Sequence, residues 1–245
     1  MMLKFITTLT VFFVLMAVIP GCKTLNNDFK KERIVVNNKN REYFIHFPNK
    51  AKDAKPAKVL FFLHGLLNPK EVFSQFSQII QAVEHLDSVM VVFPIGLKQA
   101  FALHPDMLGW TPGHFKDNVL FLESIIAQLK KDYKTNEIVV IGGGFSNGAY
   151  FLSQILQSEY SRLFFGFWLQ GGGNPQPLPP HFIKKKVFLE VGSLDSGNIR
   201  SVRELKSHLL QHGWQEGHNF FYMEFDEGHR LYLKNIERIL NDLAL

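Results

Sequence analysis

The stretch Gly142-Gly143-Gly144-Phe145-Ser146-Asn147-Gly148-Ala149 joins an apolar segment, residues 137–141, to a segment of helical character, residues 149–156. The apolar segment is typical of a strand buried on both faces of a parallel sheet. A Gly-x-Ser-x-Gly sequence in this context predicts a tight strand-to-helix turn, a nucleophile elbow, with the hydroxyl of Ser146 exposed. We expect the turn to require glycine at Gly144 and Gly148, because a side chain there would clash with neighbouring backbone. We expect the backbone of Ser146 to adopt a strained conformation.

A phosphate-binding glycine loop is the alternative interpretation of this stretch. No Gly-Lys-Ser/Thr follows the glycines, so the elbow is favoured.

The rest of the chain alternates apolar strands with helical patterns around the elbow. Residues 33–36 and 42–47 alternate as an antiparallel hairpin does. Further strands are predicted at 58–63, 88–94, 163–169, 186–192 and 219–225, and helices at 71–85, 117–133, 200–212 and 231–243. Long irregular segments cover 95–116 and 171–180. This order predicts an α/β fold, with a mostly parallel central sheet, helices on both faces and an N-terminal antiparallel hairpin.

A serine hydroxyl becomes a good nucleophile only when a base accepts its proton and a carboxylate orients that base. Asp195 follows the predicted strand 186–192, and His229 follows the predicted strand 219–225. Both positions fall on the carboxyl edge of the predicted sheet, the same edge as Ser146. We therefore expect Ser146, His229 and Asp195 to be the catalytic residues, as nucleophile, base and acid.

The sequence offers other acids and histidines as alternatives for these roles. Glu190 lies inside its strand and is expected to point into a helix layer, whereas Asp226 could assist His229. Among the histidines, the alternatives are the helix residues His208 and His212, the pre-strand residue His218, and the long-loop residues His104 and His114. His208 and His212 lack a third ligand nearby in sequence, so we expect no metal site and no cofactor.

The oxyanion of an acyl-transfer reaction needs two backbone donors. We expect them to be the N–H groups of Asn147 and Leu66, which follow the nucleophile and the strand 58–63. His64 most simply holds this turn by hydrogen bonds, although we also count it with Trp110 among the residues expected to contact substrate. Trp110 could form an apolar wall of the substrate pocket or anchor the long loop onto the core.

The N-terminus has the pattern of a signal peptide. Lys4 precedes a 15-residue apolar segment, 5–19, which is short for a membrane span. Ile19-Pro20-Gly21-Cys22 then resembles the lipobox of bacterial lipoproteins, and Cys22 is the only cysteine, so no intrachain disulfide can form. We expect a signal peptide over 1–22, a tether over 23–32 and one domain over 33–245. An ordinary secretory signal is the alternative.

Lipidation of Cys22 would place the protein on the membrane of a bacterial cell envelope. Lys23 is unlike the Asp that retains many lipoproteins at the inner membrane, so the outer membrane is favoured; a secreted or periplasmic protein is the alternative. Residues 23–58 hold ten Lys/Arg and four Asp/Glu. That charge could contact anionic headgroups or be a solvated surface. No basic helix with interleaved aromatic residues is present, so we expect no nucleic-acid partner.

Together these motifs resemble the α/β-hydrolase superfamily over residues 41–243. The stretch 144–149 is similar to the elbow of the secreted polyhydroxybutyrate depolymerase and feruloyl esterase group, and residues 117–122 are similar to a stretch preceding it there. Leu63-His64-Gly65-Leu66 is also similar to phospholipase/carboxylesterase-type proteins. The resemblance implies an α/β-hydrolase fold and a serine esterase that forms an acyl-enzyme on Ser146.

No long insertion is available for a cap or polymer-binding module, which favours small or medium ester substrates. Two other interpretations stay open: a non-catalytic envelope lipoprotein that uses the fold as a binding module, and a serine peptidase or acyltransferase.

Overall fold

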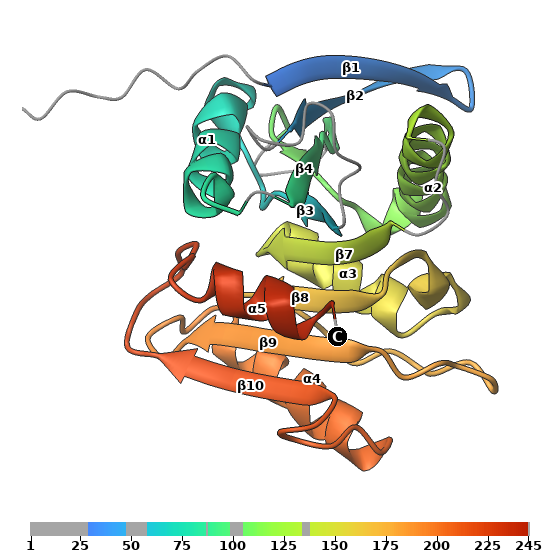
Figure 1. Ribbon diagram of the computed structural model, residues 1–245. Helices are drawn as coiled ribbons and strands as arrows, with labels where there is room; N and C mark the ends of the chain where they lie inside the picture. The colour runs from blue at the N-terminus through green and yellow to red at the C-terminus, as the bar shows by residue number, and fades with distance from the viewer. Residues whose placement is uncertain (1–28, 48–57, 87, 99–104, 134–137, 245) are drawn as a thin grey trace, which may run out of the picture.

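A computed structural model describes residues 29–47, 58–86, 88–98, 105–133 and 138–244. The predicted signal peptide, Cys22 and His104 lie outside the described residues. Figure 1 shows the described chain as a central sheet, with the N-terminal hairpin at one edge and the last strand at the other. No helix within these ranges combines the length and apolar character needed to cross a membrane.

The central sheet has eight strands in the order β1-β2-β4-β3-β7-β8-β9-β10. The β1–β2 and β2–β4 pairs are antiparallel, and every later pair is parallel. The mostly parallel sheet with an N-terminal antiparallel hairpin is therefore confirmed. The strands are β1 (Phe29–Val36), β2 (Lys39–His46), β3 (Lys58–Leu63), β4 (Val89–Pro94), β7 (Val139–Phe145), β8 (Gly166–Gln170), β9 (Lys186–Gly192) and β10 (Phe220–Phe225).

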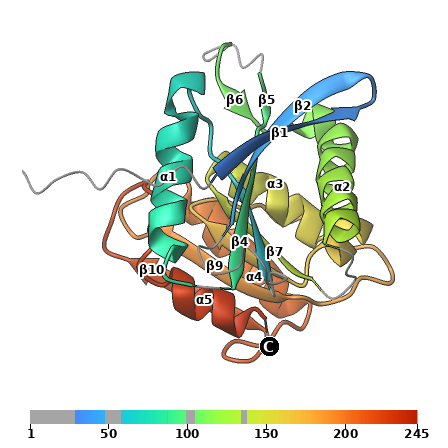
Figure 2. The same cartoon turned by 45° about the horizontal axis from the view of Figure 1, so that its top comes forward.

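Helices cover both faces of the sheet, because each buried strand presents apolar side chains alternately to the two sides. In β3, Phe61 and Leu63 belong to the core under α2, α3 and α4, whereas Leu60 and Phe62 belong to the core under α1 and α5. Figure 2 shows α1 and α5 on one side of the sheet and α2 and α3 on the other. The helices are α1 (Val72–Val83), α2 (Phe115–Asp132), α3 (Asn147–Leu156), α4 (Ile199–Gln211) and α5 (Ile236–Asp242).

The first strand begins earlier than the sequence predicts. Residues 29–32, assigned to the tether, are part of β1 and pair with β2, Phe29 opposite His46. The ring of Phe29 packs against Phe44, Phe73 and Phe76, with centroids 5.1–6.0 Å apart. Burying that ring against α1 favours strand over tether at these positions.

Three further segments differ from their predicted form. The predicted strand 163–169 begins only at Gly166, because Leu163 ends a 3₁₀ helix, η3 (Glu159–Leu163). The predicted helix 231–243 is shortened to α5, since the backbone of Tyr232 is bound by the side chain of Gln170 instead. The described parts of 95–116 contain a short antiparallel ribbon, β5 (Leu97–Lys98) and β6 (Leu108–Gly109), and the 3₁₀ helix η2 (Pro112–His114).

Candidate active site

The elbow lies between β7 and α3, at the centre of the sheet. Ser146 has φ +52° and ψ −117°, a conformation that non-glycine residues rarely adopt. A Cβ on Gly148 would lie 2.1 Å from the carbonyl oxygen of Leu63, and one on Gly144 would lie 2.9 Å from the backbone of Gly148. Both glycines are therefore required by close backbone approach, and the strained serine that the sequence predicts is present.

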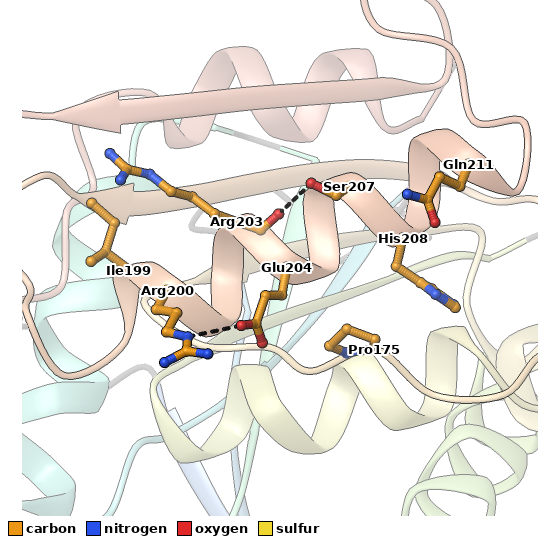
Figure 3. Close-up of a pocket in the computed structure, with 8 residues that line it drawn as sticks. All are labelled: Pro175, Ile199, Arg200, Arg203, Glu204, Ser207, His208 and Gln211. Carbon is orange, nitrogen blue, oxygen red and sulfur yellow. Dashed lines mark hydrogen bonds and ion pairs between the residues drawn. The ribbon is translucent and has the colours of Figure 1, made fainter.

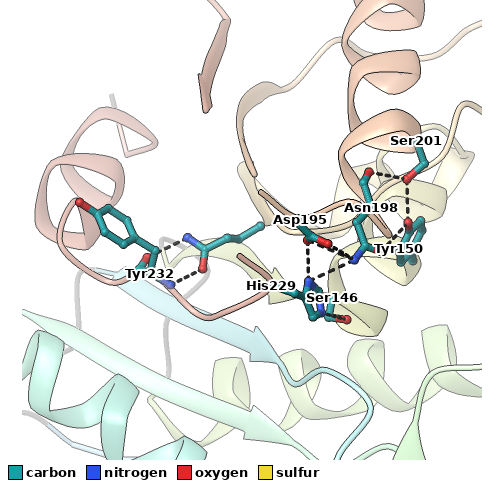
Figure 4. A network of polar contacts seen from close by, with 8 residues as sticks. Ser146, Tyr150, Asp195, Asn198, Ser201, His229 and Tyr232 are labelled. Atoms are coloured by element: carbon teal, nitrogen blue, oxygen red, sulfur yellow. Dashed lines mark hydrogen bonds and ion pairs between the residues drawn. The ribbon is translucent and has the colours of Figure 1, made fainter. Parts of the chain in front are cut away.

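A continuous hydrogen-bonded chain joins the three predicted catalytic side chains (Figure 4). Ser146 Oγ lies 2.9 Å from His229 Nε2, and His229 Nδ1 lies 2.6 Å from Asp195 Oδ2. Asp195 is 4% exposed, whereas the side chain of His229 is 38% exposed. The structure thus brings together residues separated by 49 and 34 positions in the sequence, with the carboxylate buried and the imidazole facing solvent.

The loops that carry the acid and the base are tied to one another by backbone hydrogen bonds. The N–H of Leu194 donates to the carbonyl oxygen of Glu227 at 2.9 Å, and that of Ser193 donates to Phe225 at 2.7 Å. The imidazole of His229 also stacks on the ring of Phe145, with centroids 4.8 Å apart and planes 25° apart. These contacts restrain His229 against the nucleophile strand.

The predicted oxyanion loop lies beside the nucleophile. A Cβ on Gly65 would be 3.2 Å from Ser146 Cβ, so the backbone preceding Leu66 passes directly over the serine. Leu67 is joined to Leu108 by two backbone hydrogen bonds of 2.8 and 3.0 Å, which hold this loop to β6. Asn147 is the first residue of α3, where backbone N–H groups have no partner within the helix.

His64 is fully buried, so the expectation that it contacts substrate is corrected. Its Nε2 accepts the N–H of Gly96 at 2.9 Å, so Nδ1 carries the proton and donates to the carbonyl oxygen of Gly65 at 2.6 Å. Burial lowers the pKa of His64 to about 4, with a smaller contribution from the positive charge of Arg41. His64 is a neutral structural residue of the turn.

Trp110 is also buried, at 2% exposed, and the expectation that it forms a pocket wall is corrected in favour of the anchor. Its indole stacks on Phe151 with centroids 5.5 Å apart, and its Nε1 donates to the carbonyl oxygen of His64 at 3.0 Å. The ring fills the core between the long loop and α3, because Phe115 and Phe151 supply an aromatic surface there.

The side chain of Asn147 has a role that the sequence did not suggest. Its Oδ1 accepts the N–H of Trp110 at 2.6 Å, and its Nδ2 lies 3.4 Å from the carbonyl oxygen of the same residue. The residue next to the nucleophile therefore binds both backbone groups of Trp110. We call this pair of contacts the Asn147 clamp.

A second amide forms an equivalent clamp on the loop that carries the base. Gln170 Oε1 accepts the N–H of Tyr232 at 2.6 Å, and its Nε2 donates to the carbonyl oxygen of Tyr232 at 2.7 Å. Gln170 Nε2 also donates to Glu190 Oε2 at 2.8 Å, as does Trp168 Nε1. Burial raises the pKa of Glu190, although these donors oppose the shift. We call the contacts of Gln170 with Tyr232 the Gln170 clamp.

A third polar side chain, Asn198, contacts the acid itself. It precedes α4, and its Nδ2 lies 2.9 and 3.1 Å from the two carboxylate oxygens of Asp195. Its Oδ1 accepts the hydroxyl of Tyr150 at 3.0 Å, and that hydroxyl is 2.6 Å from Ser201 Oγ. In the sequence, the only indication of this contact is that Asn198 lies three residues after Asp195, at the start of a predicted helix.

The alternative histidines lie outside this chain of contacts. Within the described ranges, His114, His208, His212 and His218 make no hydrogen bond to Ser146 or Asp195, and Asp226 is bound instead by Ser193 Oγ at 3.4 Å. The rings of His208 and His212 are 4.2 Å apart. In the same described residues, no three side chains of His, Cys, Asp or Glu gather in a way that could hold a metal ion.

A separate open hollow of about 540 Å³ lies between α4 and the loop at Pro175 (Figure 3). Three of its polar side chains are already paired, since Arg200 bonds Glu204 at 2.9 Å and Ser207 Oγ donates to the carbonyl oxygen of Arg203 at 3.0 Å. None of the predicted site residues lines it.

Comparison with known proteins identifies the fold. No protein-family model and no curated sequence matches the chain. Solved structures do match it: a ferulic acid esterase has a TM-score of 0.63 at 14% identity, covering 88% of this chain and 97% of the other. A fluorophosphonate-binding serine hydrolase of Staphylococcus aureus has a TM-score of 0.62 at 12% identity, covering 89% and 98%. A carboxylesterase of Bacillus cereus has a TM-score of 0.58 at 19% identity, covering 84% and 95%.

These similarities extend over 95–98% of each solved structure and over 84–89% of this chain. The chain therefore has the α/β-hydrolase fold that the sequence predicts. At identities below one fifth, the similarity concerns the fold, and the chemistry must be argued from the site.

Proposed function

We propose that this protein is a serine hydrolase that cleaves carboxylic esters of small or medium size. The observation that carries the proposal is the unbroken chain from the buried Asp195 carboxylate through His229 to the hydroxyl of Ser146. Nucleophile, base and orienting acid are within hydrogen-bond reach in the order that acyl transfer requires. The esterases of the same fold support ester substrates as a class.

In the proposed reaction, Ser146 Oγ attacks the ester carbonyl carbon while its proton passes to His229 Nε2. The carbonyl oxygen becomes an oxyanion, which the N–H groups of Asn147 and Leu66 would stabilise. The carbon–oxygen bond to the alcohol then breaks, and His229 returns the proton to the leaving oxygen. Water attacks the acyl-enzyme by the same steps, releasing the acid and restoring Ser146.

The buried carboxylate has a defined part in this scheme. By accepting the Nδ1 proton, Asp195 fixes the tautomer in which Nε2 is free to act as the base. It also stabilises the imidazolium that forms transiently. Because the carboxylate is 4% exposed, water competes little for this interaction.

The proposal is tested with a fluorophosphonate probe and a series of p-nitrophenyl esters of increasing acyl length. We expect the probe to label Ser146, as shown by mass spectrometry of the labelled peptide, and Ser146→Ala to lose at least about 10³-fold in kcat with folding intact. His218→Ala, which removes a histidine outside the site, is the matched control and should keep full activity. An unlabelled serine with no ester turnover would favour the non-catalytic binding module instead.

We further propose that the mature protein is attached to the membrane of a bacterial envelope by a lipid on Cys22. The support is the position of the only cysteine, which follows the short apolar segment 5–19 after Pro20 and Gly21. Cys22→Ser should move the protein from the membrane fraction to the soluble periplasmic or secreted fraction. Unchanged fractionation, or a mature N-terminus at another residue, would exclude the lipid anchor while leaving the hydrolase proposal intact.

A further inference from the structure

The side chain of Asn198 is bound to the acid of the candidate site. Its Nδ2 is 2.9 Å from Asp195 Oδ1 and 3.1 Å from Oδ2. A buried carboxylate is costly unless donors satisfy its oxygens, and the NH₂ group of Asn198 lies within 3.1 Å of both of them. Figure 4 shows Asn198 and His229 approaching the same carboxylate.

The hydroxyl of Tyr150 determines which end of the amide faces Asp195. It donates to Asn198 Oδ1 at 3.0 Å, and a carbonyl oxygen can only accept. The NH₂ group is therefore turned towards the carboxylate. Ser201 Oγ lies 2.6 Å from the Tyr150 oxygen and 2.9 Å from the backbone carbonyl oxygen of Asn198, and its one proton can be donated to either, so the tyrosine oxygen is held between Asn198 and Ser201.

The amide and the imidazole converge on a single oxygen. Asn198 Nδ2 and His229 Nδ1 are 3.1 Å apart, and both lie within hydrogen-bond distance of Asp195 Oδ2. Since both nitrogens are donors, their proximity follows from sharing this acceptor. The carboxylate is thereby fixed in the rotation that points Oδ2 at Nδ1.

We propose that Asn198, oriented by Tyr150, is a positioning residue for the hydrolysis proposed above. It acts through Asp195: it holds the carboxylate in the orientation that aligns His229 with Ser146. The inference rests on the proposed function, because a positioned acid has no consequence without a reaction at Ser146.

Two substitutions at this position separate positioning from general stability. Asn198→Ala removes the donors and should lower kcat about tenfold with little change in KM. Asn198→Asp keeps the shape but places a second carboxylate beside Asp195 and the Nδ1 side of His229. The added negative charge favours the imidazolium, so the acid limb of the kcat/KM profile should move about one pH unit higher.

The other charged groups around His229 are unchanged in these variants. On its own loop these are Asp226, Glu227, Arg230 and Lys234, with Arg230 paired to Glu227; Asp195 is the charged group of the neighbouring loop. Phe145 of β7, which stacks on the imidazole, carries no charge. A shift of the acid limb in Asn198→Asp therefore reports on the new carboxylate.

Tyr150→Phe tests the second part of the inference, because it removes only the hydroxyl that orients the amide. It should lower kcat about threefold, less than Asn198→Ala, since the amide can still adopt the productive orientation part of the time. Ser207→Ala removes a hydroxyl from the same helix, two turns beyond Ser201, and is the matched control. It should leave kcat and the pH profile unchanged.

The outcomes distinguish this inference from the proposed function. If the wild-type protein neither reacts with a fluorophosphonate nor hydrolyses esters, the proposed function fails and the inference fails with it. If the wild type is active and Asn198→Ala has the same kcat, the inference alone is overturned. A loss of kcat that follows a fall in melting temperature, with the pH profile of Asn198→Asp unmoved, would also overturn it, because Asn198 would then be merely structural.

Discussion

Two side-chain amides hold the two loops that flank Ser146, and they are supported in different ways. The Asn147 clamp binds the backbone of Trp110, and the Gln170 clamp binds the backbone of Tyr232. Beneath Trp110 lie the apolar ring of Phe151 and the neutral imidazole of His64. Beneath Gln170 lies the buried carboxylate of Glu190. The first loop is thus anchored by a buried indole, whereas the second combines this polar network with the stacking of Tyr232 on Phe225, whose centroids are 4.5 Å apart.

This difference separates stability from catalysis. Packing contributes in proportion to the apolar surface buried, so damage near Trp110 should reduce the stability of the whole fold. Hydrogen bonds contribute less to net stability but fix direction, so damage at Gln170 should chiefly misplace the loop that carries His229.

The largest expected effect is that of Trp110→Ala. Removing the indole should lower the free energy of unfolding by about 3–5 kcal/mol, as for other large-to-small core substitutions. Chemical denaturation monitors the stability, and activity should fall evenly across esters of different acyl length. A small loss of melting temperature with an altered ranking of esters would instead make Trp110 a pocket wall and would break the comparison.

The contributions of His64 and Glu190 to the stability of the fold should also change with pH in opposite directions. The pKa of His64 is lowered from 6.5 to about 4, so the folded protein disfavours its protonation. This contribution is fully present above pH 6.5 and is lost as the pH falls towards 4, by roughly 3 kcal/mol. In His64→Gln, whose amide oxygen can still accept the N–H of Gly96, the stability measured by urea unfolding should vary less between pH 6.5 and 4. An equally steep profile would contradict the burial of a neutral imidazole.

Gln170→Leu should have an intermediate effect on stability and a clear effect on turnover. It leaves both backbone groups of Tyr232 without their partner, at a cost of about 1–3 kcal/mol. Because the loop bearing His229 loses one of its restraints, kcat should fall about tenfold while KM changes little. Steady-state kinetics at a temperature well below the melting point measures this. Equal losses of stability in Gln170→Leu and Trp110→Ala, without loss of kcat, would remove the distinction between the clamps.

Glu190→Gln should produce the smallest change and the opposite pH trend from His64. Burial raises the pKa of Glu190, so the folded protein favours the protonated form, and wild-type stability falls as the pH rises above 4.5. The neutral glutamine lacks this dependence. Its stability relative to wild type should therefore increase from pH 4.5 upwards, and a relative decrease would show that the ionised carboxylate is the form that supports Gln170.

The sequence was sufficient for the parts of the site that lie at the ends of strands. Ser146 and Asp195 follow buried strands and His229 follows the partly exposed edge strand β10, and parallel strands bring such ends to one edge. Trp110 and His64 could not be assigned in this way. Their burial depends on Phe151 and Gly96, which are distant in sequence and become neighbours only in the folded chain.

The supporting polar residues were harder still to predict. The sequence predicts only that Glu190 points into a helix layer, because its partners Gln170 and Trp168 come from the adjacent strand. Asn198 precedes a predicted helix, a position where asparagine usually caps the helix N-terminus. Its contact with Asp195 depends instead on how the side chains of Tyr150 and Ser201 are oriented in the folded chain. Side-chain orientations of this kind are set by tertiary contacts, on which sequence periodicity carries no information.

The strand order described above also bears on the order in which the chain can assemble. Strands β7, β8, β9 and β10 lie side by side in the order in which they are synthesised, whereas Lys58 of β3 must wait for Val139 of β7 before that pair can form. Short-range closure is therefore available to the β1–β2 hairpin, to the β3–β4 pair and to strands β7–β10, whereas the β3–β7 seam that joins these parts is the slow, high-contact-order step. Ser146 stands at that seam and His229 follows the last strand, so the reactive chain becomes complete only when nearly the entire polypeptide has folded.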